Sequence, residues 1–224
     1  MKWISYILIP LILLFSGSAK TIRKSCPRLM VRAVPGVCID QFEWPNKPGV
    51  KPRLGLSGVV EDYDKGKKKI WDAERLCRSV GKRVCTAEEW MAACEGTEHS
   101  KYPFGDDLPK YDLGANNGLC NYDKFYRGVD EYLVFKRSVH HMEFLDQSEP
   151  AGNRKTCRSW SGAYDMVGNA EEWVRCKQGR EGWCLASRFW AEPRSCKALV
   201  PTHSPRWHYY NTGTRCCLDI KESE

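Results

Sequence analysis

The sequence predicts an α+β protein that is rich in loops and held together by disulfides. Two helical patterns follow one another directly between residues 70 and 94. Much of the remaining chain lacks a hydrophobic period and is rich in Gly, Asp, Asn, Tyr and Pro, and such stretches need bridges, metal ions or aromatic packing to hold them. The chain has twelve Cys, nine Trp and ten Tyr, which can supply both bridges and an aromatic core.

Residues 1–19 are typical of a secretory signal peptide. Lys2 provides a positive start, residues 6–15 form a short apolar run, and small residues follow it. We expect cleavage after this segment, which leaves residues 20–224 as a single domain. Because the apolar run is short for a membrane span, we expect a secreted or periplasmic protein without stable membrane insertion. A retained N-terminal anchor is the alternative.

The cysteines predict disulfides, because export delivers the chain to an oxidising compartment. No two of them have the C-x-x-C spacing of a structural zinc site. Cys26 and Cys38 bracket a short segment, and a local bridge between them is expected. Spacing alone does not choose among the other pairs.

Positive charge is spread along the chain. The formal net charge is +7, and the basic run KGKKK at residues 65–69 contains a glycine and is typical of a solvated turn. Nucleic-acid binding depends on a concentrated basic surface. It is therefore not expected.

One strand and two helices are expected in the first half. Residues 38–46 (CIDQFEWPN) have the composition of a strand that ends at its Pro and Asn. A helical pattern begins at Ile70 and ends at Gly81, because apolar residues recur at three- and four-residue steps and glycine closes the helix. The recurring residues are Ala73, Leu76, Cys77 and Val80.

The second helix follows at once. Thr86 is its expected N-cap, and Glu89 completes a capping box three residues later. One face of this helix carries Trp90, Ala93 and Cys94. Beyond it, residues 95–160 are expected to be loops, and residues 181–218 carry short aromatic pieces.

The most informative stretch is residues 162–174, GAYDMVGNAEEWV. Asn169 is expected to cap a helix with Glu172 three residues later, after a sharp turn that Gly168 permits. Asp165 and Glu172 flank this turn with carbonyl oxygens between them, and hard oxygen ligands at such irregular spacing suit Ca²⁺. An ordinary capped helix after a loop is the alternative interpretation.

Four blocks of the sequence together resemble the formylglycine-generating enzyme (sulfatase-modifying factor) family. They are CRSVGKRVCTAEEWMAAC, YPFG, GAYDMVGNAEEWV and GTRC, at residues 77–94, 102–105, 162–174 and 213–216. The blocks occur in the family's order. The resemblance implies a C-type-lectin-like variant of the fold, with two helices, a small twisted sheet and extensive loops.

The resemblance also implies two disulfides and two calcium sites. The disulfides are Cys77–Cys216 and Cys94–Cys196. The first calcium site would use the side chains of Asp165 and Glu172 with the carbonyls of Gly168 and Ala170. The second, interrupted by an insertion-like stretch, would use Asn121, the Tyr122 carbonyl, Glu143 and the Leu145 carbonyl.

The match fails at the active site that the resemblance implies. Family enzymes oxidise a substrate cysteine with two cysteines that bind copper, and the matching positions here are Ala186 and Ala191. Alanine has no thiolate to bind a soft metal or to exchange disulfides, so copper is not expected. Cys184 lies nearby as a weak candidate, and a disulfide with a partner such as Cys176 is the favoured fate for it.

Two functions follow as hypotheses. The first is an exported, calcium-stabilised member of this family with a non-catalytic binding or structural role and an unidentified protein or peptide ligand. The second is a metal-dependent oxidoreductase of the formylglycine-generating type, which acts on a protein cysteine through Cys184 or a histidine. His140 and His141 lack metal-site spacing, and His203 and His208 are expected at the surface or in packing.

Overall fold

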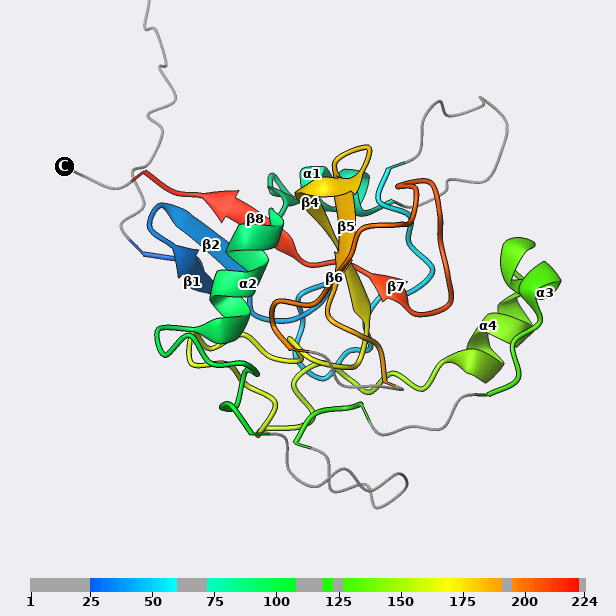
Figure 1. The fold of residues 1–224 in the computed structure, drawn as a ribbon, viewed down its shortest axis with the longest axis horizontal. Helices are drawn as coiled ribbons and strands as arrows, with labels where there is room; N and C mark the ends of the chain where they lie inside the picture. The colour runs from blue at the N-terminus through cyan, green and yellow to red at the C-terminus, as the bar shows by residue number, and fades with distance from the viewer. Residues whose placement is uncertain (1–24, 60–71, 108–118, 123–126, 191–194, 222–224) are drawn as a thin grey trace, which may run out of the picture.

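The computed structural model describes residues 25–59, 72–107, 119–122, 127–190 and 195–221. Within these ranges the chain forms four helices and eight strands. The strands make two four-stranded sheets, in the orders β1-β2-β8-β3 and β6-β5-β4-β7 (Figure 1). The expected signal peptide and the basic run at residues 65–69 lie outside the described residues.

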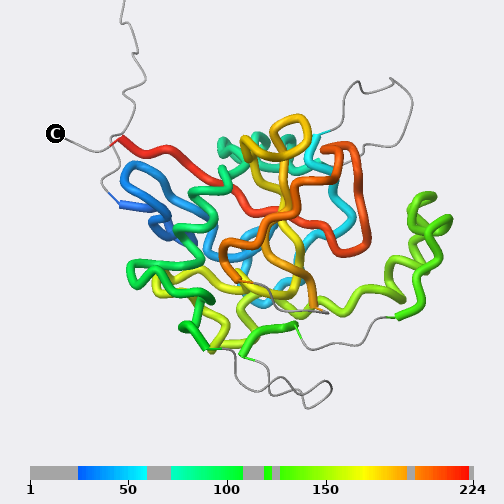
Figure 2. Tube along the Cα trace, in the orientation of Figure 1, coloured from blue at the N-terminus to red at the C-terminus, as the bar shows by residue number. Residues whose placement is uncertain are grey.

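The first sheet joins the two ends of the described chain. Its strands are β1 (Met30–Val34), β2 (Val37–Asp40), β3 (Arg83–Val84) and β8 (Cys216–Asp219). All three pairings are antiparallel, and Figure 2 shows the C-terminal strand beside the N-terminal hairpin.

The strand expected over residues 38–46 is shorter than predicted, because β2 ends at Asp40. Asn46 adopts a φ of 56°, and its side chain turns the chain back. The Asn46 Oδ1 accepts from Phe42 N, and Nδ2 donates to Asp40 Oδ1. These local hydrogen bonds compete with the ladder that a longer strand would need.

The two expected helices are present. α1 (Ala73–Ser79) begins at Ala73 rather than Ile70, because Asp72 caps it by accepting from Arg75 N. α2 (Ala87–Glu95) has the predicted capping box between Thr86 and Glu89. α2 contacts strands of both sheets and buries Trp90 completely.

The second sheet contains the segment for which the sequence predicts a helix. Its strands are β4 (Glu171–Arg180), β5 (Trp183–Ala186), β6 (Leu199–Val200) and β7 (Thr212–Gly213). The helix predicted to begin at Asn169 is therefore wrong. Asn169 has a left-handed φ of 58°, and the segment after it pairs with β5 and β7, so tertiary pairing overrides the local capping signal.

The sequence predicts that residues 95–160 are loops, and this prediction is only partly correct. They include α3 (Glu131–Phe135) and α4 (Val139–Leu145), which stand apart from both sheets in Figure 1. Helices of one to two turns are too short to show a clear hydrophobic period. Among the described residues, no helix is long and apolar enough to cross a membrane.

All twelve cysteines are described, and all are paired. The six disulfides are Cys26–Cys38, Cys77–Cys216, Cys85–Cys217, Cys94–Cys196, Cys120–Cys157 and Cys176–Cys184. They include the local bridge, both bridges that the resemblance implied, and the favoured pairing of Cys184. Closing the 139-residue separation between Cys77 and Cys216 stabilises the fold by about 5 kcal/mol in the chain-entropy description.

Candidate functional site

The turn before β4 is built from left-handed residues. Asp165, Gly168 and Asn169 have φ values of 56°, 82° and 58°. Gly168 is required there, since a Cβ atom would lie 2.2 Å from the Asn121 carbonyl oxygen. The Asn169 backbone N–H donates to that same oxygen at 2.8 Å, so the turn packs directly on Asn121.

The Asn169 side chain joins three segments instead of capping a helix. Its Nδ2 donates to both carboxylate oxygens of Glu43, at 3.0 and 2.9 Å. Its Oδ1 accepts from the backbone N–H of Glu149 and from Asn121 Nδ2. Asn169 is 1% exposed, and each buried polar atom of its amide has a partner, as buried amides require.

Glu172 forms a fully buried ion pair. Arg215 Nε donates to its two oxygens at 3.0 and 2.7 Å, and Nη2 donates at 2.7 Å. Trp90 Nε1 donates to the same carboxylate at 2.6 Å. Both charged side chains are completely buried, so this bidentate pair links α2, β4 and the residue before β8 in a medium where charges interact strongly.

Three buried carboxylates surround one buried guanidinium. Burial raises the pKa of Glu43 well above its ordinary value, and the charges of Asp165 and Glu172 raise it further. Burial also raises the pKa of Asp165 to about 6. Arg215 neutralises one carboxylate, so the cluster carries excess negative charge when all three carboxyl groups are ionised.

The expected ligands of the first calcium site are not equally suited to a calcium ion. Asp165 Oδ2 accepts from Gly152 N at 2.7 Å, and the Gly168 carbonyl accepts from Ala170 N at 2.7 Å. The Asp165 carboxylate and the carbonyls of Gly168 and Ala170 are hard oxygen donors of the kind that Ca²⁺ prefers. Glu172 fits less well as a ligand, because Arg215 and Trp90 already occupy its oxygens.

The residues expected to form the second calcium site are arranged differently from what the resemblance implies. Asn121 is 1% exposed, and its Oδ1 has no hydrogen-bond partner among the described atoms. Its Nδ2 donates to the Gln147 carbonyl at 3.1 Å. Tyr122 and Leu145 are buried, whereas Glu143 is exposed on α4. The contact from this segment to Asn121 therefore comes from Gln147, four residues beyond Glu143.

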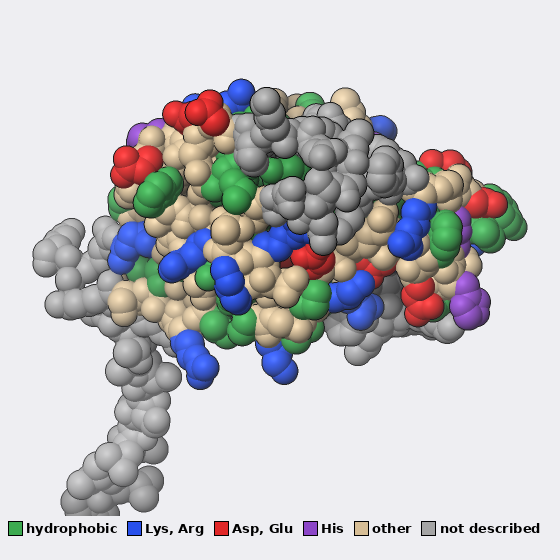
Figure 3. Space-filling model, turned by 90° about the horizontal axis from the view of Figure 1, so that it is seen from below, with side chains coloured by type: hydrophobic (Ala, Val, Ile, Leu, Met, Phe, Trp, Pro, Cys, Tyr) green, Lys and Arg blue, Asp and Glu red, His purple; other side chains and the backbone are tan. Residues whose placement is uncertain are grey.

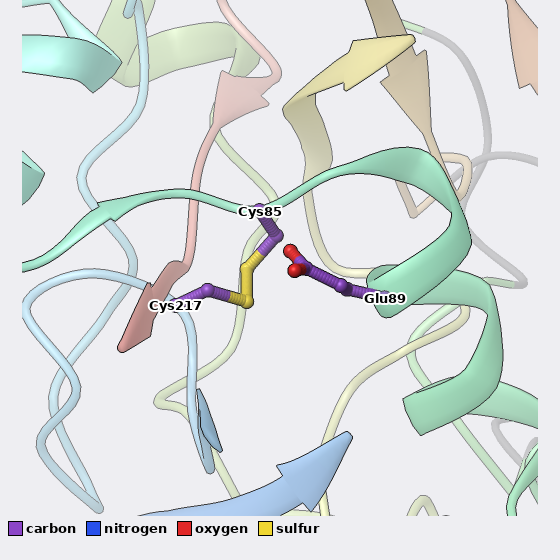
Figure 4. A group of neighbouring side chains, drawn as sticks. All are labelled: Cys85, Glu89 and Cys217. Carbon is purple, nitrogen blue, oxygen red and sulfur yellow. A yellow bond between two sulfur atoms is a disulfide. The ribbon is translucent and has the colours of Figure 1, made fainter. Parts of the chain in front are cut away.

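One further group of metal-type side chains occurs among the described residues. The ligand atoms of Cys85, Glu89 and Cys217 lie within 4.8 Å of one another. Figure 4 shows these three side chains and the bond between the two sulfurs. The two sulfurs are bonded to each other, and Glu89 is held by Arg83 at 2.7 and 2.8 Å. With no thiolate available, this group is a structural bridge and not a metal site.

The resemblance matches Ala186 to one catalytic cysteine of the family, and this residue is buried. Ala186 is fully buried at the end of β5, opposite Glu172 on β4 and Leu199 on β6. Ala191 lies outside the described residues. Cys184 is bonded to Cys176, so no described residue near Ala186 offers a thiol.

The four histidines named from the sequence do not come together in one site. His140 is exposed on α4, and His141 accepts from the backbone N–H of Asp130. His203 stacks on Trp207 with ring centroids 3.8 Å apart. Burial lowers the pKa of His203, and burial together with the charge of Arg137 lowers that of His208 to about 4.

A cavity near Ala186 was missed from the sequence. Its volume is about 440 Å³, and its lining includes Glu171, Arg188, Trp207, Tyr209, Tyr210 and Asn211. Glu171 precedes the partner of Ala186 on β4, and Arg188 follows Ala186 by two residues. The aromatic-rich run at residues 206–210 is the sequence feature that could have indicated this cavity. No hydrophobic period in the sequence shows that this run lies near β4.

One face of the molecule carries charged side chains of both signs. On the face drawn in Figure 3, Lys and Arg side chains are interspersed with Asp, Glu and apolar side chains.

The two capped helices, the small sheets and the bridged loops define a protein with the formylglycine-generating enzyme fold, a C-type-lectin-like variant. The family model of the sulfatase-modifying factor enzyme 1-like domain matches residues 69–196. This range is more than half of the chain, and the chain belongs to that family.

Several solved structures are similar over most of their length. The crystal structure of CarF has 16% identity and a TM-score of 0.49, covering 83% of this chain and 87% of that one. PvdO from Pseudomonas aeruginosa has 16% identity and a TM-score of 0.47, covering 82% and 80%. Treponema denticola variable protein 1 has 16% identity and a TM-score of 0.45, covering 82% and 84%. No curated protein matched the sequence.

Proposed function

We propose that this protein is an exported, non-catalytic member of its family with a binding or structural role. The observation that supports this most directly is the state of its cysteines, since all of them are paired. The oxidase chemistry of the family needs two thiolates at a copper ion, and Ala186 supplies none at the first position. Copper binding and oxidation of a substrate cysteine are therefore not expected.

The Cys176–Cys184 bridge supports the same conclusion. It joins β4 to β5, and the two residues are 5% and 0% exposed. Thiol–disulfide exchange requires a thiolate to reach a sulfur atom. A bridge so shielded from solvent suits a structural role.

Copper titration tests the non-catalytic role. The mature protein is expected to show no free thiols under native conditions and no stoichiometric, thiol-dependent binding of Cu(I). The Ala186→Cys variant is the positive control for thiol detection only, because it adds one thiol near the expected position and copper binding needs two. Stoichiometric Cu(I) binding by the wild-type protein that thiol alkylation abolishes would overturn the proposal.

Calcium belongs to the same proposal as a stabilising ion. Asp165 and the carbonyls of Gly168 and Ala170 would hold it, and it would balance the negative charge that Arg215 leaves. Calcium supplies no redox chemistry, so it is compatible with a scaffold that has lost its thiolates.

Export is the third part of the proposal, and it rests on residues 1–19 and on the six disulfides. The exported product is expected to begin at Lys20. N-terminal sequencing of protein recovered outside the cytoplasm checks this, and recovery of an intact N-terminus would contradict cleavage at that position.

A further inference from the structure

We propose that the cavity between Arg188 and the segment 203–211 binds a neutral sugar unit. This inference rests on the proposed binding role and names the class of ligand. The cavity has a volume of about 440 Å³, which falls within the range of roughly 300–1,000 Å³ typical of small-molecule sites. Its walls combine flat aromatic faces with a small number of polar groups.

The aromatic wall is a continuous stack. The rings of His203 and Trp207 are 3.8 Å apart and nearly parallel, at 9°. Those of Trp207 and Tyr209 are 5.0 Å apart at 15°, and Tyr209 lies 4.7 Å from Tyr210. The Tyr209 hydroxyl donates to Glu131, so this wall is held against the start of α3.

The polar floor is an ion pair. Arg188 Nη1 lies 3.5 Å from Glu171 Oε1, and their side chains are 21% and 5% exposed. Asn211 Nδ2 donates to Glu171 Oε2 at 3.2 Å. Asn211 itself is 2% exposed, and its Oδ1 has no hydrogen-bond partner among the described atoms.

The unpartnered oxygen indicates a missing donor. A buried acceptor without a partner costs about 1–3 kcal/mol. A ligand hydroxyl at this end of the cavity would donate to Asn211 after a small adjustment. The carboxylate and guanidinium beside it can respectively accept from and donate to neighbouring hydroxyls, since each hydroxyl is both donor and acceptor.

The charge of the lining favours a neutral ligand. A cationic ligand would be opposed by Arg188, and an anionic one by Glu171 and Glu131. His203 adds no charge at neutral pH, because burial lowers its pKa. A ring with one apolar face for Trp207 and several adjacent hydroxyls for the ion pair satisfies both surfaces, and a pyranose sugar has this chemistry.

Calorimetric titration of the mature, full-length protein tests the proposal. The probes are cellotriose, maltotriose, mannotriose and chitotriose, with agmatine and citrate as charged comparisons. At least one neutral trisaccharide is expected to bind, and Trp207→Ala is expected to weaken its affinity by about tenfold, which matches the loss of one aromatic contact of roughly 1.4 kcal/mol. Trp207→Phe is expected to retain most of the affinity, because it keeps a ring face.

Trp160→Ala is the matched control, since Trp160 is 64% exposed and does not line the cavity. Thermal melts of the three variants show which of them fold, and the titration of wild type with the trisaccharides still tests the proposal if Trp207→Ala does not fold. Failure of every trisaccharide to bind at millimolar concentration would overturn the inference. So would Trp207-dependent binding of agmatine, citrate or a peptide in their place. Neither result affects the copper test, which decides the non-catalytic role separately.

Discussion

At the scale of single residues, the Glu172–Arg215 ion pair determines the role of the Glu172 carboxylate in the stretch at residues 162–174. A carboxylate predicted to cap a helix and bind calcium instead satisfies a guanidinium that is fully buried. The partner lies 43 residues away in sequence, so no local pattern could indicate it. Breaking such a pair leaves one uncompensated buried charge.

Glu172→Gln is therefore expected to lower the free energy of unfolding by about 3–5 kcal/mol. Urea unfolding of the mature protein measures this change. The control is Arg78→Ala, which removes an ion pair to Glu74 whose arginine side chain is 73% exposed, and it should cost less than about 0.5 kcal/mol. Similar losses for the two variants would contradict the structural role of the buried pair.

Asp165 predicts a pH dependence of stability. Burial raises its folded-state pKa from 3.8 to about 6, so the folded protein binds this proton more tightly than the unfolded chain. The contribution is fully present below about pH 3.8 and is lost as pH rises through 6. In calcium-free buffer, wild type should therefore gain stability from pH 7 to pH 4.5 relative to Asp165→Asn. Melting temperatures at the two pH values measure this difference, and parallel curves would contradict it.

At the scale of elements, a sequence pattern predicts a helix or strand correctly when residues close together in the sequence make the stabilising hydrogen bonds. The capping box of α2 was predictable because Thr86 and Glu89 satisfy each other within one turn. β4 was not, because its four leading residues are buried on both faces and lack the alternation of a half-exposed strand. Residues 171–180 form a strand because they pair with β5 and β7.

The turn into β4 gives a second matched comparison. Gly168→Ala is expected to destabilise the protein by at least about 2–3 kcal/mol, since it adds a backbone clash to a left-handed φ. Gly81 has a similar φ of 70°, and a Cβ there meets nothing within 4 Å. Gly81→Ala should therefore cost only about 1–2 kcal/mol. Equal costs in urea unfolding would show that the contact with Asn121 is unimportant.

At the scale of the whole molecule, the loops are stabilised by six disulfides, a buried ionic cluster and the proposed calcium ion. The bridges constrain the unfolded chain. An ion that binds only the folded state stabilises it by mass action. The two contributions can be separated, because a chelator leaves disulfides intact.

Chelation of calcium is expected to lower the melting temperature of the wild-type protein by several degrees, and Asp165→Ala should abolish that sensitivity. Asp107→Ala serves as the control, because Asp107 is an exposed carboxylate outside the cluster. Scanning calorimetry with and without chelator measures the effect. A melting temperature that does not respond to calcium would count against the metal proposal.

The family and the two capped helices could be predicted from the sequence alone, because they depend on ordered blocks and on residues that act within one turn. The sequence also supported the two bridges that the resemblance implied. Three features required the tertiary structure: residues 171–180 form a strand, Arg215 forms an ion pair with Glu172, and Arg188 lines a cavity together with the aromatic stack. Each of these depends on contacts between segments far apart in sequence, whose pairing energy exceeds the local preferences that a sequence pattern records.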